Sequence, residues 1–146
     1  MTNQEIISEI TSRDTHKVWN SSCKIIEIGQ DTERIIELIP YLDLIKNKTK
    51  GLKMGGGLAP NQRFVDFAIR ILEHYKSSQE CSCNLYLEHS INPEREEKNG
   101  FITILEKKQG DWEMDYLIAC SKCGTEYKVN RNDGGHFPYF DWKKNN

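Results

Sequence analysis

The chain of 146 residues contains no apolar run close to the roughly 18 residues that a membrane-spanning helix requires. Its first residues, MTNQEIISEI, lack the basic start and long apolar stretch of a signal peptide. An excess of basic residues is also missing: residues 1–80 carry 11 basic and 11 acidic side chains, and residues 81–146 carry 9 and 11. We therefore expect a cytoplasmic protein without membrane partners, and the charge balance disfavours nucleic acid as a partner.

Motifs for catalysis are absent as well. The sequence has neither G-x-S-x-G nor H-E-x-x-H, and the glycines at 55–57 lack the Lys-Ser/Thr pair of a phosphate-binding loop. The cytidine-deaminase pattern P-C-x-x-C is not met, because Ala119 precedes Cys120. No nucleophile, general base or open metal site can be assembled from these patterns, so we predict that the protein is not an enzyme.

Residues 1–80 have the apolar spacing of three and four residues that is typical of amphipathic helices. Gly29 stands where a helix commonly ends in a left-handed residue, and a glycine-rich loop is expected over residues 46–60. The side chains expected to cap helix N-termini are Asn3, Asp14, Asp31 and Asn61. This pattern predicts an N-terminal helical bundle or a set of helical hairpins.

In residues 81–146 the pattern changes to short segments in which apolar and polar residues alternate, as is typical of strands. Their connections are rich in charged and turn-forming residues, including residues 90–100 and the hairpin signal Asp133-Gly134. Strands are expected over residues 84–89, 101–105, 116–119, 127–130 and 137–142. We therefore predict the α+β class, in which a helical region formed by residues 1–80 packs on an antiparallel β region formed by residues 81–146.

Four of the five cysteines occur in two close pairs, with the patterns C-x-C and C-x-x-C-G. Each pair adjoins an expected strand, so folding of the β region as hairpins can bring the pairs together. Four thiolates satisfy the tetrahedral coordination of zinc, and Gly124 lets the turn at the second pair direct its amides toward sulfur. Disulfides are disfavoured in a cytoplasmic chain, where thiols stay reduced. The predicted metal ligands are Cys81, Cys83, Cys120 and Cys123.

This arrangement resembles a zinc ribbon. Zinc ribbons usually carry C-x-x-C or C-x-x-x-C in both pairs, whereas the first pair here is tighter, and His89 and His136 are candidates to replace one cysteine. The resemblance implies a Zn²⁺ ion on four thiolates, which leave no open position for a catalytic water. The predicted zinc is therefore structural and compensates for a small apolar core. Cys23 falls on an apolar helix face and is expected to be a buried core thiol.

Three groups of side chains are candidates for recognition, each with a structural alternative. The aromatic residues of segment 136–142 either cover the zinc unit or form an exposed recognition patch. An acidic cluster either lies in a solvated turn or steers a basic partner, and a lysine cluster either lies in a solvated loop or contacts phosphates. These clusters are Glu94, Glu96 and Glu97, and Lys46, Lys48, Lys50 and Lys53.

In overall plan, the chain is small, cytoplasmic and rich in Lys, Ile and Asn, with no catalytic residues and a zinc knuckle. This plan resembles the immunity proteins of bacterial polymorphic or contact-dependent toxin systems. The resemblance covers plan and composition, and it implies neutralisation of a cognate toxin by tight binding through acidic and aromatic side chains. The alternatives are a zinc-ribbon module associated with nucleic acid and a regulatory or structural subunit of a larger assembly.

Overall fold

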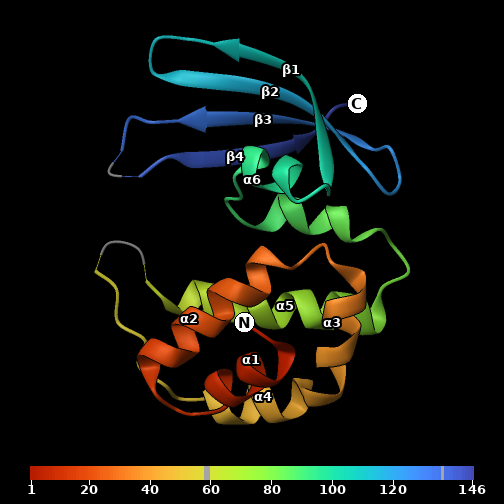
Figure 1. Ribbon diagram of the computed structural model, residues 1–146. Helices are drawn as coiled ribbons and strands as arrows, with labels where there is room; N and C mark the ends of the chain where they lie inside the picture. Colours follow the sequence, from red (N-terminus) through yellow and green to blue (C-terminus); the bar gives the residue numbers. More distant parts are fainter. Residues whose placement is uncertain (58–59, 136) are drawn as a thin grey trace. The chain divides into compact units, whose positions relative to one another are not determined.

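The computed structural model describes residues 1–57, 60–135 and 137–146, and the chain forms two compact units, Met1–Ser82 and Cys83–Asn146 (Figure 1). Helices make up the first unit, and a four-stranded antiparallel sheet dominates the second, so the chain has the predicted α+β class. Within the described residues, no helix has both the length and the apolar character needed to cross a bilayer.

The helical unit is organised around its longest helix, α5, which packs against α2, α3 and α4. Each helix buries one apolar face, as the sequence periodicity predicts, and Ile25, Ile71 and Leu72 lie at the centre of this core with 1% exposure or less. The helices are α1 (Asn3–Ile10), α2 (Thr15–Glu27), α3 (Thr32–Leu38), the 3₁₀ turn η1 (Ile39–Tyr41), α4 (Leu42–Thr49) and α5 (Gln62–Ser77).

Two of the four expected N-caps are confirmed, since the side chains of Asp14 and Asp31 accept hydrogen bonds from backbone N–H groups of α2 and α3. Asn3 is not the cap of α1, because Thr2 takes that position in a reciprocal capping box. Asn61 precedes α5 but makes no capping bond with its side chain.

The glycine-rich loop, expected from residue 46, begins later, because α4 continues to Thr49.

Gly29 differs from its predicted role, because its backbone is not left-handed. A Cβ atom at this position would lie 3.1 Å from the carbonyl oxygen of Ile26 and 3.2 Å from Cδ1 of Ile71. The glycine is therefore suited to close packing between the end of α2 and α5. The hydroxyl of Tyr75 on α5 donates a 2.8 Å hydrogen bond to the Gly29 carbonyl, which fixes this turn further.

The sheet of the second unit has the simple order β1-β2-β3-β4, and every neighbouring pair is antiparallel. A 3₁₀ helix, η2 (Ser82–Glu88), and the short helix α6 (Pro93–Lys98) precede it. The strands are β1 (Ile102–Gln109), β2 (Glu113–Cys120), β3 (Glu126–Asn132) and β4 (Tyr139–Lys144). The β1–β2 and β3–β4 connections lie at one end of the sheet, and the β2–β3 connection lies at the other (Figure 1).

One face of this sheet is buried and the other is open, as expected for an antiparallel sheet in a small domain. The buried face packs on the segment before β1: the Tyr86 ring stacks on Trp142 at a centroid distance of 4.2 Å, and Trp142 Nε1 donates to the Ile91 carbonyl at 2.8 Å. The buried residues on the strands include Tyr116, Ile118, Tyr127, Val129 and Trp142.

The predicted strand over residues 84–89 is wrong, because residues 84–88 belong to η2. Leu85 and Tyr86, which are adjacent within this segment, are both only 1% exposed. A half-buried strand cannot direct two adjacent side chains to the same face of a sheet. Residues 90–100 are also more ordered than predicted, since Asn92 caps α6 and Pro93 opens it. Among the described residues, the other four expected strands are present, with different ends.

Candidate metal centre

The structure brings the two cysteine pairs together, as their spacing predicts. The sulfur atoms of Cys81, Cys83, Cys120 and Cys123 all lie within 4.8 Å of one another, and this cluster is positioned to bind a metal ion. Cys83 Sγ and Cys123 Sγ are 3.6 Å apart. All five cysteines of the chain lie among the described residues, and no disulfide joins any of them.

The donor set fits a tetrahedral ion bound by thiolates. A Zn–S distance of about 2.3 Å places the sulfurs of a regular tetrahedron about 3.8 Å apart. The 3.6 Å separation of Cys83 and Cys123 is close to this value, and the outer limit of 4.8 Å requires only small side-chain movements. Burial is graded, because Cys83 and Cys120 are buried, Cys81 is half-buried and Cys123 is exposed.

The second cysteine pair lies in the tight turn between β2 and β3. Gly124 has a φ of 77°, which lets its N–H donate to the Cys120 carbonyl at 2.9 Å. Cys120 N–H in turn donates to the Thr125 carbonyl at 2.9 Å, and Lys122 N–H lies 3.4 Å from Cys120 Sγ. Gly124 thus closes the turn with a left-handed backbone, and the amide that lies close to the Cys120 sulfur is that of Lys122.

The first cysteine pair lies where the chain enters η2 and not at the end of a strand. Ser82, between the two cysteines, is 6% exposed and is hydrogen-bonded through both its side chain and its carbonyl to Gln30. The tight C-x-C spacing is thus accommodated in a helical turn whose central residue is anchored.

Tyr127 is a site residue that sequence reasoning missed. It lies on β3, is fully buried, and its hydroxyl donates to Cys83 Sγ at 3.1 Å. Burial, followed by the hydrogen bond to Cys83, raises the pKa of Tyr127 above its usual range, so the phenol remains a donor. Its sequence signal is weak, because a tyrosine on a strand beside a knuckle is most simply explained as core.

The predictions for the two histidines and for the fifth cysteine, Cys23, have different outcomes. His89 is not a member of the cysteine cluster, and His136 lies outside the described residues. The expectation that Cys23 is buried is wrong in degree, because this thiol is only half-buried. It stands at the edge of the buried face of α2, beside Ser22 and Ile26.

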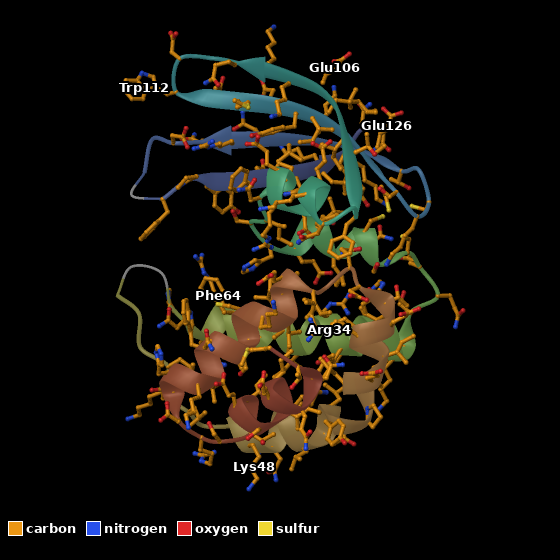
Figure 2. All side chains as sticks on the ribbon, viewed as in Figure 1. Arg34, Lys48, Phe64, Glu106, Trp112 and Glu126 are labelled. Atoms are coloured by element: carbon orange, nitrogen blue, oxygen red, sulfur yellow. The ribbon has the colours of Figure 1, made fainter. Side chains whose placement is uncertain are left out.

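Some aromatic side chains of the C-terminal segment are buried in the core, and others are exposed and available for recognition. Phe140 and Trp142 are buried, whereas Phe137 and Tyr139 are 77% and 56% exposed. Trp112 on the neighbouring β1–β2 hairpin is 78% exposed, and Figure 2 shows its side chain at the free end of that hairpin. A hydrogen bond of 3.2 Å from Asp133 N–H to the Trp112 carbonyl joins the two hairpin ends. We call the three exposed side chains the aromatic tip: Trp112, Phe137 and Tyr139.

The acidic cluster is not a freely solvated turn. Glu96 is 1% exposed and accepts a 3.0 Å hydrogen bond from Tyr86, and Glu97 accepts one of 2.7 Å from the backbone N–H of Ile104. Glu94 accepts hydrogen bonds from Lys107 and Tyr116, which lower its pKa. Burial, together with the hydrogen bond to Glu94, raises the pKa of Tyr116 to about 12. All three carboxylates are therefore engaged within the fold.

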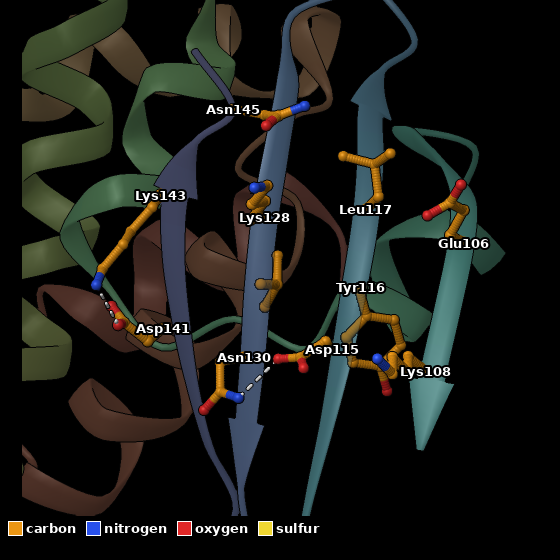
Figure 3. Close-up of a pocket in the computed structure, with 11 residues that line it drawn as sticks. Glu106, Lys108, Asp115, Tyr116, Leu117, Lys128, Asn130, Asp141, Lys143 and Asn145 are labelled. Atoms are coloured by element: carbon orange, nitrogen blue, oxygen red, sulfur yellow. Dashed lines mark hydrogen bonds and ion pairs between the residues drawn. The ribbon is translucent and has the colours of Figure 1, made fainter. Parts of the chain in front are cut away.

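The open face of the sheet carries a shallow groove of about 610 Å³ (Figure 3). Ion pairs and hydrogen bonds within it, such as Asp141 with Lys143 and Asn130 with Asp115, tie some of its polar groups to one another. The groove has no excess of one sign, because its charged side chains are Glu106, Asp115, Asp141, Lys108, Lys128 and Lys143.

Comparison of the chain with protein-family models, with curated proteins and with solved structures finds no match.

Proposed function

We propose that this protein is a non-enzymatic protein-binding module whose sheet unit is stabilised by a structural zinc ion on Cys81, Cys83, Cys120 and Cys123. The observation that supports the metal-binding part of the proposal is the cluster of four cysteine sulfurs within 4.8 Å. Four thiolates complete the tetrahedral shell of zinc, and a catalytic site needs a position for water. A cytoplasmic location, where thiols stay reduced, suits this ligand set.

The proposed ion supplies folding free energy to a unit with a limited core. Within the sheet unit, Tyr86 of η2 packs on Tyr127 and Trp142 of the apolar face, and α6 contacts β1. A domain of this size usually needs a metal, disulfides or a partner to reach several kcal/mol of stability, and structural zinc contributes more than that on binding.

The aromatic tip is the surface that we propose for partner binding. Trp and Tyr dominate the binding energy of protein interfaces, and side chains that are 56–78% exposed contribute little to the fold. Trp112 is flanked by Asp111 and Glu113, so the tip suits a partner with an apolar pocket and a basic rim. In its most specific form the proposal is a bacterial immunity protein, whose partner is a toxin with a basic substrate cleft.

The test is a pull-down of the tagged full-length protein from its native cell lysate, with and without nuclease, read by mass spectrometry. We expect to capture one stoichiometric protein, whether or not nuclease is added. The double variant Trp112→Ser/Tyr139→Ser should no longer capture this protein. The control variant Ile36→Ser, which changes an exposed apolar side chain of the helical unit, should still capture it. Inhibition of that protein's activity by the purified chain supports immunity, and unchanged activity in a permanent complex supports a subunit. Retention by the tip variant contradicts the proposed surface.

Nucleic-acid binding is the second candidate, and one observation favours it. The four lysines of the cluster are all exposed, and Arg13 adds a cation by donating to the carbonyls of Lys48 and Lys50. The cluster consists of Lys46, Lys48, Lys50 and Lys53. Changing the four lysines to Glu tests this candidate in a gel-shift assay. If nuclease removes the captured proteins and the lysine variant no longer binds nucleic acid, nucleic-acid binding replaces the protein-binding proposal.

A further inference from the structure

Gln30, in the turn between α2 and α3, makes a reciprocal pair of hydrogen bonds with Ser82, the residue between Cys81 and Cys83. Its Nε2 donates to the Ser82 carbonyl at 3.0 Å, and Ser82 Oγ donates to Gln30 Oε1 at 2.7 Å. Gln30 and Ser82 are 5% and 6% exposed. A buried amide that is both donor and acceptor to one residue fixes the position and the orientation of that residue.

A second side chain of the helical unit holds the other flank of Cys81. His74, near the end of α5, is 4% exposed, and its Nε2 donates to the Glu80 carbonyl at 3.1 Å. Cys81 therefore lies between two residues whose backbone carbonyls are hydrogen-bonded to buried side chains. The turn that carries Gln30 is itself tied to α5 by the bond from Tyr75 to Gly29.

We propose that Gln30 is a positioning residue for the metal centre. By fixing Ser82, it holds Cys81 and Cys83 in a turn where both sulfurs face the second cysteine pair, although only one residue separates them. This inference rests on the proposed metal-binding function. The two bonds between Gln30 and Ser82 keep these two ligands close together before the ion arrives, which lowers the entropic cost of binding in the way that hydrogen-bonding partners of ligands do at other metal sites.

The coupling between the Gln30 turn and the metal centre acts in both directions. If folding of the Gln30 turn favours metal binding, metal binding stabilises that turn by the same free energy. Occupancy of the cysteine cluster is thus expected to raise the thermal midpoint of the helical unit as well as that of the sheet unit.

The experiment measures the affinity of the full-length protein for Zn²⁺ by competition with a chelator and for Co²⁺ from its thiolate charge-transfer band. Gln30→Met keeps the side-chain length and removes both hydrogen bonds, and we expect 10- to 100-fold weaker binding of both ions. The saturated Co²⁺ spectrum should remain that of four thiolates, because Gln30 is not a ligand. Ser82→Ala removes one of the two bonds and should give a smaller loss, and it tests the proposal if Gln30→Met does not fold.

Ser22→Ala is the matched control, because it removes a buried hydrogen bond within α2, from Ser22 Oγ to the Val18 carbonyl. A purely structural role for Gln30 predicts that Gln30→Met and Ser22→Ala both lower the metal-free thermal midpoint and leave the affinity unchanged. That result overturns the proposal for Gln30 while the metal centre stands. Failure of the wild-type protein to bind either ion overturns the metal centre itself, and the role of Gln30 with it.

Discussion

The four clustered cysteines differ in their surroundings although they share one predicted role. Cys83 is 1% exposed and accepts a hydrogen bond from Tyr127, whereas Cys123 is exposed, and its sulfur lies 3.2 Å from Thr125 Oγ1. Hydrogen bonds to a sulfur disperse thiolate charge and orient the ligand. We therefore expect Cys123 to be the first of the four to react with an alkylating reagent.

Tyr127→Phe tests the hydrogen bond to sulfur. It deletes one hydroxyl from a fully buried ring, and we expect about tenfold weaker zinc binding, at the lower end of the effect typical for partners of metal ligands. Competition with a chromogenic chelator measures the change.

Tyr86→Phe is its matched control, since Tyr86 belongs to the same aromatic cluster but donates to Glu96. It should lower stability while leaving the zinc affinity of the folded protein close to that of the wild type. Equal zinc affinities for the wild type and Tyr127→Phe would show that the bond to Cys83 has no such role.

Glu94 gives a prediction about acid. Hydrogen bonding to Lys107, and then to Tyr116, lowers the pKa of Glu94 in the folded protein below its usual 4.5. The carboxylate therefore contributes stability above pH 4.5, and this contribution is lost as the pH falls through the lower folded pKa. Because the group is largely exposed, we expect Glu94→Gln to cost less than about 1 kcal/mol at pH 7. Urea unfolding of both proteins across pH 3–7 should show the difference disappearing in acid; a constant difference would contradict the prediction.

At the scale of elements, periodicity predicts those segments whose environment is set by one face. The helices of the first unit and the four strands of the second follow from such patterns, because each has one buried and one solvated side. The segment η2 does not follow, since Leu85 and Tyr86 are adjacent and both buried, and Tyr86 stacks on Trp142, which lies far along the chain. The cysteine pairs are visible from local spacing, whereas Gln30 and Tyr127 act on residues 52 and 44 positions away, a relation that no local pattern contains.

The two hairpins at the tip end provide an element-scale prediction. Trp112→Ser should change the thermal midpoint by no more than about 1–2 °C, because its ring is 78% exposed and surface substitutions usually cost under about 0.5 kcal/mol. Trp142→Ala removes a ring that is 4% exposed and stacked on Tyr86, and it should cost about 3–5 kcal/mol. Thermal and urea unfolding compare the two. A large destabilisation by Trp112→Ser would mean that the tip supports the fold and would weaken its proposed role in partner binding.

At the scale of the whole molecule, the proposed ion divides the chain into a region that requires metal and a region that does not. A strong chelator should unfold the four-stranded sheet that follows the Cys81–Cys83 turn, because structural zinc supplies folding free energy that this small core lacks. The core of the helical unit lies within its own helices, so its helical signal should persist at a lower thermal midpoint. Circular dichroism and hydrogen exchange measure the two regions separately. An unchanged β-sheet signal after complete metal removal would contradict a structural role for the ion.

The distribution of the three tryptophans has a practical consequence. Trp19 lies against Phe64 in the helical unit, Trp142 is buried beside Tyr127, and Trp112 is exposed on the tip. Each ring thus occupies a separate optical environment, and variants that keep a single tryptophan would report on one event each. Quenching and emission colour would distinguish loosening of the helices, opening of the sheet core and capture of a partner in the same sample, without an attached dye.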